Sequence, residues 1–287
     1  MLRLAVIGND RDVEEYLKLA PRTRAASIAR LADVTELDRQ GFDAVVLCPR
    51  DSQEEDWRFV AARGHHLFLV KPPGSAELVT ELLEACKTQD VRLMVGSRRY
   101  LPAVCAIKQS LDSGELGNLG LIRMHHWQPH LANLVAEIDL AIWMFQTMPT
   151  EIFALAENES NKKNRHFQLH LGFPGEGMVL IDGATLPTST KNYFSLSVIG
   201  GTGAAYADDH HNQQLLFRGE QSISLTTGEG EIARLTELQE FVNALNQQRA
   251  PLVTGVDALR ACLVFEAAYE SVGRGTVARL VGDHYEC

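Results

Sequence analysis

The chain lacks the cysteine pairs that would staple a secreted fold or hold a structural metal. Its 287 residues include five cysteines, an odd number, and none of them stands at the short spacing of a zinc site. His210 and His211 follow two aspartates, but adjacent side chains in a polar turn point away from each other. We therefore predict reduced thiols and no bound metal.

The chain also lacks an excess of positive charge and any long apolar run. Its formal net charge is −10, whereas a nucleic-acid partner requires a basic face. No apolar run approaches the ~20 residues that span a bilayer, and the first residues, MLRLAVIGND, read as a strand instead of a signal peptide. We expect a cytoplasmic protein with no nucleic-acid or membrane partner.

What the chain does contain is an alternation of strands and helices over its first 118 residues. Short apolar runs at 2–8, 25–29, 42–48, 67–70 and 92–95 are separated by segments with helical spacing. Such an alternation predicts an α/β fold with a doubly wound parallel sheet and right-handed crossovers. The length of the chain favours two domains, and we place their boundary near the glycines at 117–120.

The pattern changes in residues 119–287. Apolar and polar residues alternate in segments joined by turns rich in glycine and asparagine, at 121–127, 152–156, 167–173, 178–182, 193–200 and 222–226. Helical spacing returns at 133–145, 235–245 and 254–272. We therefore predict an α+β second domain whose strands are mainly antiparallel.

A lysine follows the fourth predicted strand of the first domain. Leu67 to Val70 form an apolar run, Lys71 comes next, and two prolines then prevent the strand from continuing. Open α/β sheets bind ligands at the carboxyl ends of their strands, so Lys71 is a candidate catalytic residue. The alternative is a lysine that extends from a strand end into water. Arg99 and Tyr100, after the next strand, are candidate substrate contacts.

Three segments together resemble one family of enzymes. They are residues 69–102, Ser110 to Arg123, and Leu238 to Leu280. In order and spacing they resemble the glucose-fructose oxidoreductase, inositol dehydrogenase and MocA-like family. The resemblance implies an N-terminal Rossmann domain for NAD or NADP, a C-terminal domain built on a large open sheet that often mediates homo-oligomer formation, and hydride transfer on a sugar or cyclitol.

The family's Glu-Lys-Pro signature reads Val70, Lys71, Pro72 in this chain. The resemblance implies that Lys71 hydrogen-bonds the reacting hydroxyl near the nicotinamide and that Pro72 lies beside the cofactor. A desolvated lysine amine suits that role if its pKa falls toward neutrality. The acidic neighbour of the family's lysine is replaced by valine.

The family's G-x-G-x-x-G phosphate fingerprint is retained only at Gly8. Asp10 stands at the second glycine, where the backbone must approach the pyrophosphate, and Val13 stands at the third. A carboxylate about 4 Å from a phosphate charge costs on the order of 4 kcal/mol at an effective dielectric constant of about 20, which is roughly a thousandfold in affinity. Arg11 offsets part of this repulsion.

Three further positions are candidate cofactor contacts. Arg30 falls where the family carries its ribose anchor, and an arginine there suits a 2′-phosphate. Pro49 and Arg50 follow the third strand, and Arg50 is a candidate phosphate contact. The alternative is that both arginines are solvated surface charges, and the choice between NAD and NADP stays open.

The family's proton-transfer residues are missing from their expected positions. When the family's last helical aspartate is aligned with Asp139, Ala136 stands at its histidine and Ala132 at its first aspartate. His130, just upstream, is a candidate substitute acid or base. Asp139 is a candidate substrate contact, and the alternative for it is a role in helix packing.

These observations leave several hypotheses open. The chain is an NAD(P)-dependent oxidoreductase acting on a small carbohydrate, or an inactive homologue that senses a ligand or binds a protein. A third hypothesis is a reductase for a non-sugar substrate, in which lysine and solvent supply the proton.

Overall fold

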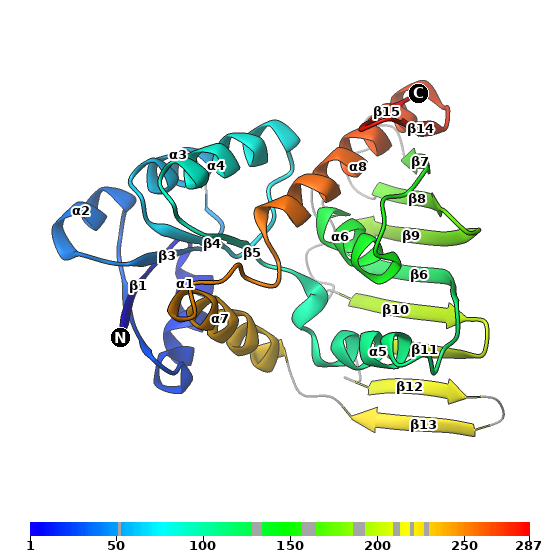
Figure 1. Ribbon diagram of the computed structural model, residues 1–287, viewed down its shortest axis with the longest axis horizontal. Coiled ribbons are helices and arrows are strands. Elements are labelled where there is room, and N and C mark those ends of the chain that lie inside the picture. The colour runs from blue at the N-terminus through cyan, green and yellow to red at the C-terminus, as the bar shows by residue number, and fades with distance from the viewer. Residues whose placement is uncertain are drawn as a thin grey trace. The chain divides into compact units, whose positions relative to one another are not determined.

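The computed structural model describes residues 1–50, 53–127, 134–156, 165–185, 193–208, 213–218, 221–226 and 230–287. It is drawn in Figure 1. The chain forms two compact units. Unit 1 comprises Met1–Tyr100 and Gly230–Leu259, and unit 2 comprises Leu101–Glu229 and Arg260–Cys287.

Unit 1 is built on a five-stranded sheet in which every pair of neighbours is parallel, as predicted. The order is β2-β1-β3-β4-β5. The strands are β1 (Leu2–Ile7), β2 (Ala26–Arg30), β3 (Ala44–Leu47), β4 (His66–Leu69) and β5 (Leu93–Val95). Their buried apolar side chains, such as Leu4, Val46 and Phe68, form the centre of the unit.

Helices cover both faces of this sheet. Figure 1 shows α3 and α4 on one face and α1 and α7 on the other. The helical segments are α1 (Asp10–Leu19), η1 (Ala20–Arg22), η2 (Val34–Glu36), α2 (Leu37–Gln40), α3 (Gln53–Ala62), α4 (Ala76–Thr88), η3 (Arg98–Tyr100) and α7 (Gly230–Asn246). Aromatic rings join α1, β4 and α7, because Phe68 lies 6.1 Å from Tyr16 and 5.6 Å from Phe241 between ring centroids.

Unit 2 is built on a ten-stranded sheet with the order β13-β12-β11-β10-β6-β9-β8-β7-β14-β15. Only β6 and β9 pair in parallel among these strands. The strands are β6 (Leu119–Trp127), β7 (Glu151–Ala156), β8 (Arg165–Phe173), β9 (Gly177–Thr185), β10 (Tyr193–Gly200), β11 (Gly203–Asp208), β12 (Gln213–Arg218), β13 (Gln221–Thr226), β14 (Ala278–Val281) and β15 (His284–Glu286). The prediction of a mainly antiparallel sheet is confirmed.

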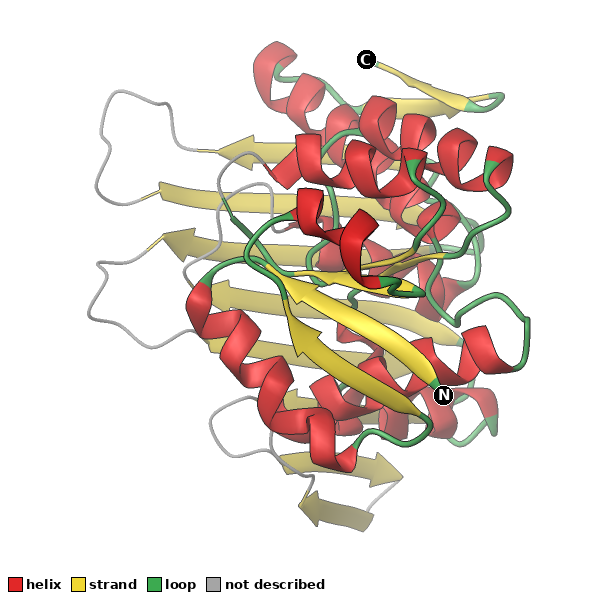
Figure 2. Cartoon of the chain, turned by 90° about the vertical axis from the view of Figure 1, so that its left-hand side faces the viewer, coloured by secondary structure: helices red, strands yellow, loops and turns green. Residues whose placement is uncertain are grey.

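Three helices lie on one face of this sheet, as Figures 1 and 2 show. They are α5 (Pro102–Asp112), α6 (Leu134–Phe145) and α8 (Gly255–Arg274). Helix α5 packs on β11 and β12, and α6 packs on β6 and β9. Ser271 of α8 accepts a hydrogen bond from the Ala154 amide of β7 at 3.1 Å. This face is therefore the covered face of the sheet.

The opposite face, here called the open face, is defined by the strand registers. Pairings between Leu155 and Gln168, Gln168 and Asp182, and Asp182 and His125 place these side chains in one row on it. The registers of β10 and β11 continue the row to Asp208. Because alternate side chains of a strand share a face, Met178 and Tyr206 lie on the open face as well.

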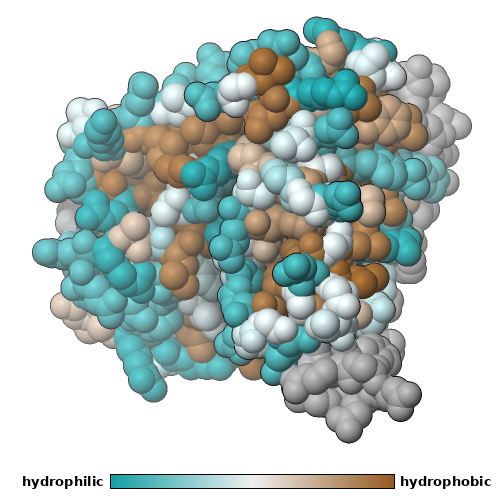
Figure 3. Space-filling model, turned by 45° about the vertical axis from the view of Figure 1, so that its right-hand side comes forward, coloured by the Kyte–Doolittle hydropathy of each residue, from teal (hydrophilic) through white to brown (hydrophobic). Residues whose placement is uncertain are grey.

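Large hydrophobic side chains are exposed on the open face. Leu155 is 51%, Met178 57% and Tyr206 36% exposed. In the view of Figure 3, hydrophobic residues gather in patches between hydrophilic ones. None of the described helices combines the length and apolar character needed to cross a membrane.

The two compact units differ from the contiguous division into 1–118 and 119–287 that the sequence predicts. Unit 1 ends at Tyr100 because α5, which follows, packs on β11 and β12 of the second sheet. Residues 230–259 return to unit 1 because α7 buries Leu238, Phe241 and Val242 against its strands. A helix with this apolar stripe is equally compatible with either sheet when only the sequence is considered.

Candidate functional site

The carboxyl edge of the sheet in unit 1 gathers several of the residues singled out from the sequence. All five strands are parallel, so they end at the same edge. The strand order reverses between β1 and β3, where open α/β sheets form a ligand crevice. Gly8 follows β1, Pro49 and Arg50 follow β3, and Lys71 is the second residue after β4.

Gly8 lies in a loop that has no room for a side chain at this position. Its φ is +147°, and a Cβ placed there would lie 2.5 Å from both the Cβ and the carbonyl oxygen of Cys48. No side chain fits between the ends of β1 and β3. The first glycine of the fingerprint therefore has a structural cause in this chain.

Asn9 is a residue of this edge that the sequence analysis missed. Its Oδ1 accepts a hydrogen bond from the Asp12 amide at 3.0 Å, which caps α1, and its Nδ2 donates to Asp12 Oδ2 at 2.7 Å. The same Nδ2 donates to the Pro49 carbonyl at 2.6 Å and so links the loops after β1 and β3. The available signal was an asparagine immediately before a helical pattern, since asparagine is a preferred N-cap.

Arg30 lies at the carboxyl end of β2 in a cluster with two acidic residues of α1. Its Nη2 forms an ion pair with Asp10 Oδ1, and its Nη1 lies 3.5 Å from Glu14 Oε1. All three side chains are at least 44% exposed, so each pair contributes only about 0–1 kcal/mol to stability. Arg11 is 87% exposed and lies 3.9 Å from Glu15.

Arg50 is held more firmly than Arg30. Its Nε and Nη2 donate to the two carboxylate oxygens of Asp56 at 2.5 and 2.7 Å, and its Nη2 lies 3.5 Å from Asp33. The hydrogen bond to Asp56 raises the pKa of the Arg50 guanidinium above its usual range. A bidentate pair of this kind is strong and directional, so Arg50 joins the loop after β3 to α3.

Lys71 is exposed, and among the described residues its amine has neither an ion-pair nor a hydrogen-bond partner. Pro72 beside it is half-buried. A side-chain amine that has no partner among the described residues and lies at the ligand edge of the sheet is available to a bound hydroxyl or carbonyl group. The catalytic role of Lys71 and the cofactor role of Pro72 remain predictions.

The two predicted substrate contacts after β5 are buried. Arg99 is 8% exposed, and its Nη2 lies 3.2 Å from Asp257 Oδ1. Burial raises the pKa of Asp257, but the Thr254 amide and Arg99 outweigh it and bring that pKa below its usual range. Tyr100 is 5% exposed within the hydrophobic core, where burial raises the pKa of its hydroxyl. These locations favour packing roles for both.

Glu237 of α7 is a second residue that the sequence analysis missed. It is 8% exposed, and its carboxyl accepts a hydrogen bond from the Ser97 amide at 2.9 Å, directly after β5. Burial raises the pKa of Glu237 to about 8. Nothing in the local sequence marks this glutamate, because acidic residues are frequent on helices.

In unit 2, the helix that carries the family's proton-transfer positions is α6. Asp139 is 5% exposed, and Ala136 lies one turn before it. Buried Glu137 lies with its Oε1 3.2 Å from His126 Nδ1 of β6. A buried carboxyl close to an imidazole suits a structural pair between helix and sheet. His130, Ala132, His210 and His211 lie outside the described residues.

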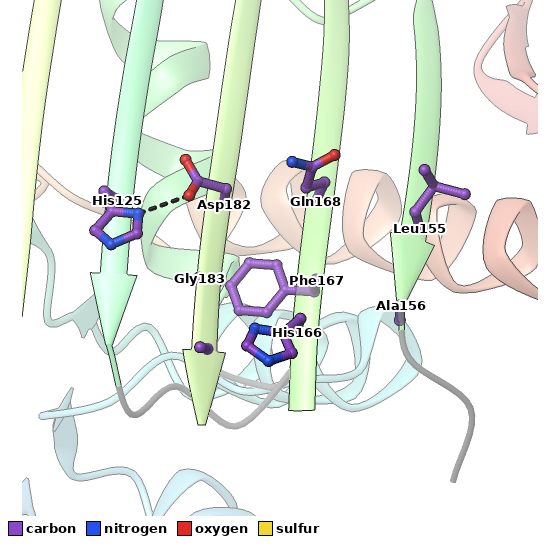
Figure 4. Close-up of a pocket in the computed structure, with 9 residues that line it drawn as sticks. His125, Leu155, Ala156, His166, Phe167, Gln168, Asp182 and Gly183 are labelled. Atoms are coloured by element: carbon purple, nitrogen blue, oxygen red, sulfur yellow. Dashed lines mark hydrogen bonds and ion pairs between the residues drawn. The ribbon is translucent and has the colours of Figure 1, made fainter. Parts of the chain in front are cut away.

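The sheet of unit 2 also has a pocket of about 360 Å³ near the ends of β6, β9 and β8. Figure 4 shows His125 and Asp182 turned toward each other from neighbouring strands, with Nδ1 and Oδ2 2.6 Å apart. The pocket is lined by His125, Leu155, Ala156, His166, Phe167, Gln168, Asp182, Gly183 and Ala184. No group of three or more potential metal ligands occurs in the part of the chain that the structure describes.

The parallel sheet with its ligand edge and the large, mainly antiparallel sheet define a two-domain oxidoreductase fold of the Rossmann type. A sequence model described as "Oxidoreductase family, C-terminal alpha/beta domain" matches residues 108–280, which is more than half of the chain. The chain belongs to the glucose-fructose oxidoreductase, inositol dehydrogenase and MocA-like family of oxidoreductases.

Three similar proteins illustrate the match. An inositol 2-dehydrogenase of Rhizobium meliloti (strain 1021) is 25% identical over 268 residues, covering 80% of this chain and 78% of that protein. A levoglucosan dehydrogenase in complex with NADH and L-sorbose has a TM-score of 0.84 at 13% identity and covers 98% of this chain and 99% of its own. An Agrobacterium radiobacter oxidoreductase in complex with NAD+, L-tartaric acid and magnesium has a TM-score of 0.83 at 17% identity, covering 97% and 98%.

At the carboxyl edge, the backbone conformation is compatible with a bound dinucleotide, but the acidic side chains repel its phosphates. Gly8 leaves the loop bare, and α1 begins next to it, as a pyrophosphate site requires. Asp10 and Asp12 occupy the first turn of that helix, and Arg30 and Arg50 are already paired with carboxylates. Among the described candidate arginines of this edge, Arg11 is the most exposed, at 87%, and it lies 3.9 Å from Glu15.

Proposed function

We propose that this protein is an NAD(P)-dependent oxidoreductase that transfers hydride between the dinucleotide and a hydroxyl-bearing carbon of a sugar or cyclitol. Membership of the oxidoreductase family and the similarity to an inositol 2-dehydrogenase support the reaction class. The observation that carries the proposal is Lys71, an exposed amine without an internal partner among the described residues, at the ligand edge of the sheet.

The residues of the edge divide into two roles. Oxidation of an alcohol removes a hydride from carbon and a proton from oxygen, and a bound nicotinamide supplies the hydride acceptor. Gly8, Arg11, Arg30 and the Pro49–Arg50 loop would hold the dinucleotide. Lys71, as a neutral amine, would accept the proton of the reacting hydroxyl and release a proton to solvent. Ala136 has no proton to give or take, so Lys71 carries this step without a helical histidine.

Cofactor binding and turnover test the proposal. NADH or NADPH at millimolar concentration should raise the melting temperature of the purified chain, and a panel of sugars and cyclitols should yield a substrate with one of the cofactors. Lys71→Ala should then lower kcat/KM by about 100-fold or more, the usual contribution of a proton-transfer group. Lys87→Ala, which removes a lysine from the last turn of α4, is the matched control and should leave turnover unchanged.

Two results would contradict the proposal. One is a melting temperature that neither cofactor changes, together with no turnover of any substrate. The other is a Lys71→Ala variant with the turnover of the unmodified chain.

A second candidate function is a redox-inactive homologue that senses a ligand or binds a protein. It is favoured by Ala136 at the family's histidine position and by the carboxylate partners of Arg30 and Arg50. This candidate predicts a stable protein indifferent to dinucleotides. Nicotinamide found bound after purification would exclude it.

A third candidate is a reductase for a non-sugar carbonyl compound, with lysine and solvent as proton donors. A screen of carbonyl substrates with each cofactor would test it.

We further propose that the chain forms a homo-oligomer through the open face of the sheet in unit 2. Leu155, Met178 and Tyr206 expose apolar surface there on three different strands. Apolar surface distributed over several strands of one face is typical of an interface.

A further inference from the structure

We infer that Asp10 sets the dinucleotide affinity of this chain, because its carboxylate both holds Arg30 and occupies the place where the pyrophosphate approaches α1. The inference rests on the proposed dinucleotide-binding role of the carboxyl edge. Asp10, Arg30 and Glu14 are called the Asp10 cluster below.

Asp10 lies at the N-terminus of α1, at the ligand edge of the sheet. Asp10 is the first residue of α1, two residues after Gly8, and its side chain is 85% exposed. The N-terminus of this helix is the place where a Rossmann edge receives an anion. An exposed carboxylate at that place repels a pyrophosphate.

Arg30 is already engaged by carboxylates. One terminal nitrogen of its guanidinium pairs with Asp10 and the other lies 3.5 Å from Glu14. A phosphate group that binds Arg30 must first displace these carboxylates. The Asp10 cluster is therefore a competitor built into the chain at the position where the sequence predicts a 2′-phosphate contact.

Arg11 is a nearby exposed cation, but Arg50 is not free to replace Arg30. Arg50 is bound by both oxygens of Asp56, and its side chain is only 22% exposed. The side chain of Asn9 caps α1 and donates a hydrogen bond to the Pro49 carbonyl in the loop after β3. Removing the Asp10 carboxylate therefore lowers the repulsion and leaves Glu14, at 3.5 Å, as the remaining partner of Arg30 in the Asp10 cluster.

The size of the effect follows from the exposure of the cluster. A like charge about 4 Å away in an effective dielectric of about 20 weakens binding roughly a thousandfold, and full solvent screening reduces this to less than about tenfold. Asp10 is exposed but close to the anion, so we expect Asp10→Gly to lower the Kd by about 10-fold to 100-fold. The gain should be larger for NADPH than for NADH, because Arg30 without its Asp10 partner meets the 2′-phosphate.

The experiment is isothermal titration of the full chain with NADPH and NADH at low and at high NaCl concentration. The variants are Asp10→Gly, Asp10→Asn, which removes the charge and keeps a side chain, and Asp38→Asn. The last is the matched control, because Asp38 of α2 forms an exposed ion pair with Arg63, the residue after α3, and not with a residue of α1. Thermal unfolding without ligand verifies that each variant is folded.

The expected result is tighter binding in both Asp10 variants, a gain that shrinks at high salt because exposed charges are screened, and no change in Asp38→Asn. Equal Kd values for Asp10→Gly and the unmodified chain, or no binding by either, would overturn the inference. If Asp10→Gly fails to fold, the same comparison with Asp10→Asn decides. An unmodified chain without turnover contradicts the proposed function, while tighter binding by Asp10→Gly still supports the inference.

Discussion

Glu237 shows how one buried ionisable side chain ties the stability of unit 1 to pH. Its carboxyl lies between α7 and the turn after β5, where it accepts a hydrogen bond from the Ser97 amide. Burial raises its pKa from the ordinary value of 4.5 to about 8. Between these two values the folded chain keeps a proton that the unfolded chain has lost.

The sign of the pH dependence follows directly. The folded state binds more protons in this window, so the contribution of Glu237 to the free energy of unfolding is complete below about pH 4.5 and is lost as the pH rises toward 8. The loss is about 1.4 kcal/mol per pH unit at most. Glu237→Gln keeps an acceptor for Ser97 and does not titrate. Its stability relative to the unmodified chain should therefore rise between pH 5 and pH 8, as measured by urea denaturation across that range.

Glu240 provides the matched control on the same helix. It is as buried as Glu237, but Arg249 donates to both of its oxygens at 2.6 and 2.7 Å. Glu240→Gln breaks a charged pair and should lower the free energy of unfolding by about 1–3 kcal/mol near neutral pH. Parallel pH profiles for Glu237→Gln and the unmodified chain would show that Glu237 ionises normally in the fold.

At the scale of elements, the loop between β1 and α1 passes very close to the end of β3. Gly8 has a φ of +147° and lies against Cys48, whereas Gly41 has a φ of +62° and only the end of the Arg3 side chain nearby, at 3.4 Å. The two glycines thus share a positive φ, in different regions of backbone space, and differ in the room available to a side chain.

Alanine at each position separates these two effects. Gly8→Ala adds a clash with backbone to the strain and should lower the free energy of unfolding by about 2–4 kcal/mol. Gly41→Ala adds mainly strain and should cost about 1–2 kcal/mol. Denaturant titration measures both, and equal losses would mean that the approach of Gly8 to Cys48 relaxes without cost.

The sequence predicted elements better than the contacts between their side chains. The run from Leu67 to Ser75 contains residues typical of a strand, a turn and a helix N-cap. As an N-cap, Ser75 accepts a hydrogen bond from the Leu78 amide at 3.3 Å. The pair between Arg30 and Asp10 joins residues 20 positions apart. A charged residue in a sequence does not reveal which opposite charge its long side chain will reach, so the state of both candidate phosphate arginines was not predictable.

At the scale of the whole molecule, the sequence predicted a parallel sheet followed by a mainly antiparallel one. It did not predict which segments of the chain belong to each unit. Strands β11, β12, β14 and β15 were not predicted, and α7 returns to unit 1. Short strands such as β14 and β15 carry little periodicity, and an amphipathic helix does not specify its sheet. Long-range packing decides both, and no local pattern encodes it.

The open face of the sheet in unit 2 is where the whole molecule should meet a second copy of itself. A charge at the centre of an apolar interface is desolvated without a partner and opposes assembly. Met178→Glu should therefore convert the oligomer into monomers, because Met178 is 57% exposed on β9, a strand inside the sheet. Light scattering coupled to size-exclusion chromatography gives the mass of each species.

Leu252→Glu is the matched control for this experiment, since Leu252 is 67% exposed in unit 1 and lies off the open face. It should leave the mass unchanged. If the unmodified chain is a monomer at micromolar concentration, or if Met178→Glu assembles as the unmodified chain does, the open face is not the interface. Leu155→Glu tests a second strand of the same face, so dissociation by both variants, but not by Leu252→Glu, would assign assembly to the face and not to a single side chain.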